Sequence, residues 1–140
     1  MIRLELKPSK CNLCNGKVIY TSNARIYGTE YGSGMMYYCT KCKAYVGTHK
    51  PRPKEALGLL ANKEMRDMKC KCHELFDKKW KNEPTSKKRF KARRNAYREL
   101  AKKLNIDLGE CHFGYFDLDT LKRVYRLLES EEADNVSNKS

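Results

Sequence analysis

The pattern of apolar and polar residues changes near residue 52. Before that point, β-branched and aromatic residues form short runs at positions 17–21 and 35–39, with turn signals at 15–16 and 32–34. Short runs of this kind beside glycine-containing turns are typical of strands joined in hairpins. The first part of the chain is therefore predicted to form β-hairpins.

Beyond two prolines, at positions 51 and 53, apolar residues recur at steps of three and four, which is the spacing of one face of an α-helix. A first stripe begins after Asn62, a residue type that commonly caps helices, and ends near Lys81. A second stripe runs from Phe90 to Leu104, and a third begins after Asp117. The pattern predicts about three helices, with no apolar stripe past residue 130.

Four of the seven cysteines, Cys11, Cys14, Cys39 and Cys42, follow the spacing C-x2-C-x24-C-x2-C. A structural zinc site takes four ligands in a tetrahedron, and each C-x-x-C pair places two sulfurs on one tight turn. Gly16 follows the first pair where the backbone must turn beneath the metal, and the intervening residues suffice for two antiparallel strands. The spacing predicts a zinc ribbon that binds one Zn²⁺ and leaves no open coordination position. Four buried free thiols are the less favoured alternative.

These patterns together predict an α+β fold, in which N-terminal zinc-ribbon β-hairpins precede a C-terminal helical part of about three helices. We expect residues 1–52 to form the ribbon and residues 53–130 to form a basic helical region packed on it. Residues 131–140 have no apolar pattern and are predicted to be a disordered acidic tail.

Lysine and arginine outnumber aspartate and glutamate 30 to 17, which gives a formal net charge of +13. This surplus favours a polyanionic partner, because each phosphate that a basic side chain neutralises releases counterions. Residues 78–94 hold nine basic residues against one acid, and we expect Trp80 and Phe90 in this segment to lie in the core. A solvated surface is the alternative reading of the charges. The predicted nucleic-acid contacts are Lys78, Lys79, Lys81, Lys87, Lys88, Arg89, Lys91, Arg93 and Arg94.

The three histidines, His49, His73 and His112, are candidates for a shared functional site. His73 and Asp77 are i,i+4 neighbours on a predicted helix, so the carboxylate can hold the imidazole in one tautomer. These four residues are the candidate catalytic groups, and the alternative is that each histidine is an ordinary hydrogen-bonded core residue. The order His49, Asn62, His73 is also similar to that of HNH nucleases, in which these residue types activate water, orient it and bind a metal. The spacing fits that motif poorly.

No stretch approaches the roughly 18 apolar residues that a membrane-spanning helix needs, and no apolar segment follows the N-terminus as in a signal peptide. The odd number of cysteines argues against a secreted disulfide scaffold. We therefore expect a cytoplasmic protein without a membrane partner.

Several strings of the sequence resemble a known family, the zinc-finger-containing domain of unknown function found in bacteriophages and Gram-positive bacteria. The matching strings lie at 38–49, 57–62, 73–77 and 111–114, and the similarity covers roughly residues 8–128. The resemblance implies a phage or prophage setting in a bacterial host cell and a zinc-bound fold. It implies no particular activity.

The residues favour a binding protein over an enzyme. In this hypothesis the ribbon stiffens a platform, and the helical part offers a basic surface to nucleic acid or to a nucleic-acid-associated partner. One alternative is a metal-dependent, HNH-like nuclease that uses His49, Asn62 and His73. Another is a phage protein that binds and inhibits a host or defence protein.

Overall fold

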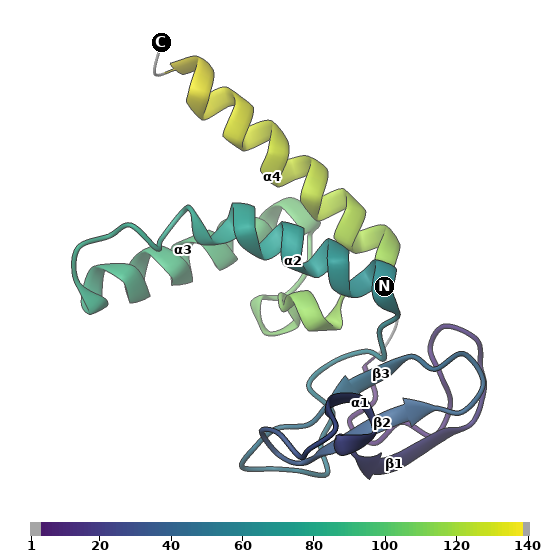
Figure 1. Ribbon diagram of the computed structural model, residues 1–140. Coiled ribbons are helices and arrows are strands. Elements are labelled where there is room, and N and C mark those ends of the chain that lie inside the picture. The colour runs from purple at the N-terminus through teal and green to yellow at the C-terminus, as the bar shows by residue number, and fades with distance from the viewer. Residues whose placement is uncertain (1–3, 139–140) are drawn as a thin grey trace. The chain divides into compact units, whose positions relative to one another are not determined.

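The computed structural model describes residues 4–138, with side chains described through residue 134 (Figure 1). The described chain forms two units, which we call the ribbon unit and the helical unit. The ribbon unit comprises residues 4–66 and 114–117, and the helical unit comprises residues 67–113 and 118–138. The sequence predicts a boundary near residue 52, whereas the structure keeps residues 53–66 with the ribbon. The predicted packing of helices on the ribbon stays a prediction.

The ribbon unit contains a three-stranded antiparallel sheet with the strand order β1-β2-β3. Its strands are β1 (Val18–Ser22), β2 (Met35–Cys39) and β3 (Tyr45–Gly47), and the short helix α1 (Ala24–Tyr27) lies between the first two in the chain. Val18 pairs with Cys39, so the start of β1 lies beside the end of β2, next to the second cysteine pair. The predicted hairpins are confirmed.

Two tyrosine hydroxyl groups explain why the two prolines do not end the ribbon unit. Tyr37 donates a hydrogen bond to the carbonyl of Lys54 at 2.6 Å, and Tyr20 donates one to the carbonyl of Pro53 at 2.7 Å. Further along, Tyr45 and Ala61 exchange both backbone hydrogen bonds. Proline prevents helix continuation but leaves its own carbonyl free to accept, so the chain stays attached to the sheet.

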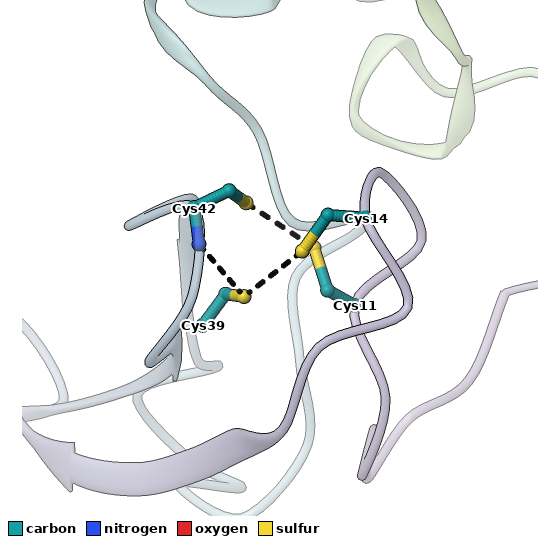
Figure 2. A group of neighbouring side chains, drawn as sticks. All are labelled: Cys11, Cys14, Cys39 and Cys42. Atoms are coloured by element: carbon teal, nitrogen blue, oxygen red, sulfur yellow. Dashed lines mark hydrogen bonds between the residues drawn. The ribbon is translucent and has the colours of Figure 1, made fainter.

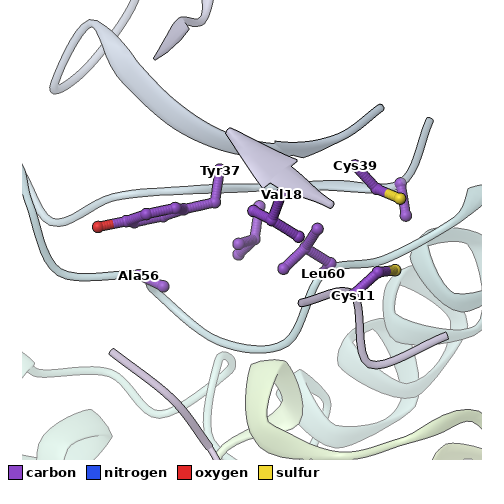
Figure 3. Close-up of a cluster of buried hydrophobic side chains, with 8 residues drawn as sticks. Cys11, Val18, Tyr37, Cys39, Ala56 and Leu60 are labelled. Atoms are coloured by element: carbon purple, nitrogen blue, oxygen red, sulfur yellow. The ribbon is translucent and has the colours of Figure 1, made fainter. Parts of the chain in front are cut away.

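One buried apolar cluster of the ribbon unit includes two of the metal-site cysteines (Figure 3). Its buried members are Cys11, Val18, Tyr37, Cys39, Ala44, Val46, Ala56 and Leu60. The unit also buries Met36, Leu59, Ala61, Met65 and Phe116, which lie outside this cluster. The buried cysteines are part of what holds this unit together.

Three long helices follow the sheet in the chain: α2 (Lys63–Asp77), of which all but the first four residues belong to the helical unit, and α3 (Ser86–Leu104) and α4 (Leu118–Asn138), which lie wholly within it. Short 3-10 turns form at Leu108–Glu110 and Phe113–Tyr115. Asn62 caps α2 as predicted, because its side-chain oxygen accepts the backbone N–H of Met65 at 2.9 Å. The core centres on aromatic rings: Phe76 lies 4.6 Å from Tyr97 and 5.2 Å from Phe113, centroid to centroid. The α+β fold class is thus confirmed.

Helix α4 runs to Asn138, whereas the sequence predicts disorder from residue 131. Ion pairs explain the difference. Glu131 pairs with Lys79 and Lys103, and Glu132 pairs with Lys78 at 3.3 Å. Glu131 and Glu132 lie in the segment that has no apolar pattern, and both form ion pairs with lysines of the same unit. Residues 139–140 of the predicted tail lie outside the described residues.

The expectation that Phe90 lies in the core is wrong: its side chain is 68% exposed. Every buried residue of α3 lies at Ala96 or beyond, so the first ten residues of the helix have no buried member. Trp80 is partly buried, and its indole N–H donates to Asp77 at 3.1 Å. The helical period identifies the apolar face of α3, but not how far along the helix that face is covered.

Candidate metal centre and basic helix

The two cysteine pairs meet at one point of the ribbon unit (Figure 2). The Sγ atoms of Cys11 and Cys42 are 3.6 Å apart, and those of Cys14 and Cys39 are 3.4 Å apart. All four sulfurs lie within 4.8 Å of one another. A tetrahedron of thiolates around zinc, with Zn–S bonds of about 2.3 Å, places its sulfurs about 3.8 Å apart. The four cysteines therefore fit one tetrahedral metal ion.

The two knuckles, residues 11–16 and 39–44, share one backbone geometry. In the first, the N–H of Cys11 donates to the carbonyl of Gly16 at 2.9 Å, and in the second the N–H of Cys39 donates to that of Ala44 at 2.8 Å. The residue after each pair, Asn15 or Lys43, has a positive φ, of 63° and 69° respectively. Repetition of an uncommon backbone conformation at matching positions indicates that both turns are shaped around the same group.

Backbone N–H groups point at the sulfurs and favour their ionised form. Leu13 donates to the Sγ of Cys11 and Gly16 to that of Cys14, both at 3.3 Å, and Cys42 donates to that of Cys39 at 3.4 Å. Such charge-assisted bonds stabilise thiolates in the way that metal ligation requires.

The pKa values of two of the metal-site thiols, Cys39 and Cys42, are shifted in opposite directions. Burial raises the pKa of Cys39, but the N–H groups of Cys42 and Lys41 and the side chains of Cys14 and Cys42 together outweigh it and bring the pKa down to about 6. Burial and the neighbouring sulfurs raise the pKa of Cys42 to about 12. Four like charges at this spacing repel one another unless a cation lies between them. A divalent metal ion supplies that charge.

Gly16 has no side chain, and atoms of Lys41, Cys14 and Cys39 lie close to where its Cβ would be. A Cβ at this position would lie 2.7 Å from the Cβ of Lys41, 3.1 Å from the Sγ of Cys14 and 3.2 Å from the Sγ of Cys39. The equivalent position of the second knuckle is Ala44, which is buried with a methyl group. Only the first knuckle requires a residue without a side chain.

The zinc-finger-containing domain family matches residues 7–131, which is most of the sequence. The chain belongs to this family. Comparison with curated proteins and with solved structures finds no significant match. The family and the four-cysteine cluster together indicate a bound metal ion, and zinc is the metal that the family description names. Among the described residues of this zinc-finger domain, no helix is long and apolar enough to cross a membrane.

The other three cysteines lie in the helical unit and have no metal-site geometry. Cys72 and Cys111 are buried, and burial raises the pKa of each thiol to about 11. Their Sγ atoms point at backbone carbonyls, of Leu121 at 3.4 Å and of Tyr97 at 3.7 Å. Both therefore behave as protonated core residues, while Cys70 is exposed.

Two of the three histidines contact one aromatic cluster of the helical unit. The ring centroid of His73 lies 4.4 Å from Phe113, that of His112 lies 6.5 Å from Tyr97, and those two partner rings are 6.2 Å apart. His49 belongs to the ribbon unit, so the predicted convergence of all three histidines stays a prediction. Among the described residues, the four cysteines are the group that gathers closely enough to hold a metal.

The environment of His73 favours its neutral form. Burial lowers the pKa of the imidazole, Asp77 opposes that shift, and Lys69 and Arg93 add to it. The carboxylate of Asp77 accepts the indole N–H of Trp80, so its hydrogen-bond partner here is the tryptophan.

Asn62, the central residue of the nuclease alternative, is already engaged. Its side-chain oxygen accepts the backbone N–H of Met65, and its backbone carbonyl accepts the backbone N–H of Arg66 at 3.0 Å. A side-chain oxygen that already accepts a hydrogen bond from a backbone N–H as a helix cap does not orient an attacking water molecule. The geometry therefore gives no support to the order His49, Asn62, His73 as a catalytic set.

Four of the nine predicted nucleic-acid contacts have partners within the helical unit. Lys78 and Lys79 pair with glutamates of α4. Arg89 donates to the carbonyl of Glu83 at 2.9 Å and to the hydroxyl of Ser86 at 3.1 Å. The guanidinium of Arg93 lies between two rings, 5.6 Å from the Trp80 centroid and 5.3 Å from that of Tyr97. The other five are Lys81, Lys87, Lys88, Lys91 and Arg94, and all are exposed.

The exposed basic residues of α3 continue beyond Arg94, where the predicted basic segment ends. Five exposed cations follow one another at steps of four, three, four and four residues, which keeps them on one side of the helix. At a rise of 1.5 Å per residue the row is about 22 Å long. Within the described chain, none of the five pairs with a carboxylate. We call this row the basic stripe, and its members are Lys87, Lys91, Arg94, Arg98 and Lys102.

Arg98 and Lys102 lie outside the basic segment predicted from the sequence. Charge density marks the end of that segment, because the density falls beyond residue 94, where Glu99 lies among the basic residues. The helical spacing of the basic residues is the sequence signal that includes Arg98 and Lys102.

Proposed function

We propose that this zinc-finger domain binds nucleic acid through the basic stripe of α3, and that it does so in the cytoplasm of a bacterial cell, in a phage or prophage setting. The ribbon unit serves as a folded platform held by one Zn²⁺. The observation that carries the proposal is the row of five exposed cations without carboxylate partners in the described chain.

The dimensions of the basic stripe suit a phosphate backbone. Its length of about 22 Å corresponds to six or seven nucleotide steps of about 3.4 Å along one strand of a duplex. Lysine and arginine on flexible stems bind phosphate oxygens without reading base sequence. Binding of this kind depends weakly on sequence and steeply on salt.

The metal has a structural role in this proposal. Cys11, Cys14, Cys39 and Cys42 fill all four positions of a tetrahedral ion, so no position remains for a water or a substrate. Zinc would supply the charge that keeps the two knuckles together. The proposal therefore assigns no catalytic step to this centre.

An acidic protein surface is a second candidate partner, of the kind that a host or defence protein could offer. One observation favours it: Glu131 and Glu132 already pair with lysines of the helical unit, which shows that carboxylates suit this environment. The basic stripe has no such partner in the described chain, so an acidic protein could take the place that phosphate takes in the first proposal.

Fluorescence anisotropy with labelled 20-nucleotide DNA and RNA, single- and double-stranded, tests the proposal. The decisive variant replaces all five residues of the basic stripe with glutamine. For B-DNA, the slope of log affinity against log salt should fall by about four to five units. Absence of binding at low salt would favour the acidic protein partner.

A charge-matched control separates position from net charge. It replaces five exposed lysines of the ribbon unit with glutamine, namely Lys7, Lys10, Lys17, Lys50 and Lys54. Both variants lose five positive charges. The proposal expects the control to keep most of the salt slope, and equal losses in both would mean that only net charge matters.

A further inference from the structure

The exposed Phe90 is unusual for its surroundings. It is the most exposed phenylalanine, leucine or isoleucine among the exposed large apolar residues of the described chain, at 68%. It lies in the first half of α3, where no residue is buried. Burying its ring would stabilise the fold, so its position in solvent represents apolar surface that the described chain leaves uncovered.

Two members of the basic stripe flank this ring. Lys87 lies three residues before Phe90 and Arg94 lies four residues after it, so both neighbour it on the helix surface. Both cations are exposed and without carboxylate partners in the described chain. The helix itself is firmly started, because the hydroxyl of Thr85 accepts the N–H of Lys88 at 3.1 Å. A rigid helical turn thus presents an apolar ring between two cations.

We infer that Phe90 stacks on a base and that the nucleic acid bound by this protein is single-stranded. The inference rests on the proposed function and names its substrate class. A ring flanked by cations matches a single strand, in which an unpaired base offers a free face beside its own phosphates. In a duplex both faces of each base are already stacked, so the same contact would require unstacking.

The charge of the flanking residues decides between this partner and an apolar protein surface. An apolar partner that covered Phe90 would also remove Lys87 and Arg94 from water without neutralising them, which is costly. A nucleic-acid strand covers the ring and pairs both cations at once. Charge complementarity therefore favours the strand.

An abasic oligonucleotide separates stacking from charge. We would measure the affinity of the full-length zinc-bound protein for labelled dT20, for an abasic 20-mer of equal charge and for a 20-base-pair duplex at the same salt concentration. The inference expects dT20 to bind more tightly than the abasic strand by roughly 5- to 150-fold for each stacked base. Phe90→Ala should abolish that difference and leave the salt slope unchanged, because no charge is removed.

Two controls keep the result interpretable. Phe90→Trp should preserve the preference for dT20, because the larger ring also stacks. Leu108→Ala removes another exposed apolar residue of the helical unit, 44% exposed, and should change nothing. Thermal unfolding by circular dichroism should show that Phe90→Ala folds normally, since the ring has little contact to lose.

The possible failures are distinguishable. Equal affinity for dT20 and the abasic strand, with a steep salt slope, would overturn base stacking and leave phosphate binding intact. No binding to any oligonucleotide would overturn both proposals. A dimer in sedimentation that Phe90→Ala dissociates would assign the ring to contact with a second copy and overturn the inference.

Discussion

The ribbon unit and the helical unit reach a stable fold by different means. In the ribbon unit one buried cluster of eight residues includes two metal-site cysteines. In the helical unit the core is built from rings and branched side chains, among them Phe76, Leu121 and Val124, each under 2% exposed. A small unit gains more from a metal cross-link, because it buries a smaller fraction of its surface. We therefore expect the metal centre to matter most in the ribbon unit and apolar packing to matter most in the helical unit.

Removing the metal should have the largest effect and should act on one unit. A structural zinc site contributes on the order of 10 kcal/mol, about as much as the whole stability of a small domain. Cys39→Ser should unfold the ribbon unit and leave the helical unit folded. Trp80, the single tryptophan, reports on the helical unit, so its fluorescence should stay native while the ribbon resonances in NMR spectra collapse.

The matched control for Cys39→Ser is Cys70→Ser, which removes an exposed thiol outside the metal centre. Elemental analysis of protein purified without added metal should give one zinc per chain for the control and none for Cys39→Ser. A folded, metal-free Cys39→Ser ribbon would contradict the division of roles. Iron in place of zinc would correct the metal and leave the comparison standing.

Removing a ring from the helical core should have the converse result. Phe76 is fully buried and touches Tyr97 and Phe113. Phe76→Ala should lower the free energy of unfolding of the helical unit by about 3–5 kcal/mol, since it leaves a cavity. Urea unfolding followed by Trp80 fluorescence measures this loss, and the zinc content should stay at one. Loss of zinc in this variant would show that the two units do not fold independently.

The metal centre was predictable from the sequence because its chemistry is local. C-x-x-C fixes a turn, and the spacing between the pairs fixes a hairpin, so Cys11, Cys14, Cys39 and Cys42 could be identified without any knowledge of packing. The Asn62 cap was predictable for the same reason. Each cysteine pair, like the cap, depends on residues within a few positions of one another.

What the sequence did not predict depends on contacts between distant residues. The ribbon extends past Pro51 and Pro53 because the tyrosines of the sheet bind carbonyls beyond them. Helix α4 passes residue 131 because Glu131 pairs with Lys79, which lies between α2 and α3, and with Lys103 of α3. Phe90 is exposed because α3 is longer than the core that covers it. The helical period of a sequence identifies the apolar face of a helix, but it does not identify the segments that pack against that face.

The two knuckles allow a finer test within the ribbon unit. Gly16→Ala should destabilise the ribbon by about 1–3 kcal/mol, because the new Cβ would lie 2.7 Å from the Cβ of Lys41. Ala44→Gly, at the equivalent position, should cost only about 1 kcal/mol through lost burial and added flexibility. Competition with a chromophoric chelator ranks the zinc affinities of the two variants. Gly109→Ala, whose Cβ would meet no atom within 4 Å, is the neutral control.

Acidification should produce the smallest effect, and it should act on the helical unit through His73. Burial lowers the pKa of this histidine in the folded state below its unfolded value of about 6.5, with Lys69 and Arg93 contributing and Asp77 opposing. Below that unfolded pKa the unfolded state binds the proton more readily, so stability falls as the pH drops. His73→Phe should flatten the decline between about pH 7 and 5, measured as urea midpoints from Trp80 fluorescence. A wild-type midpoint that rose on acidification would show that Asp77 dominates and that the histidine gains charge on folding.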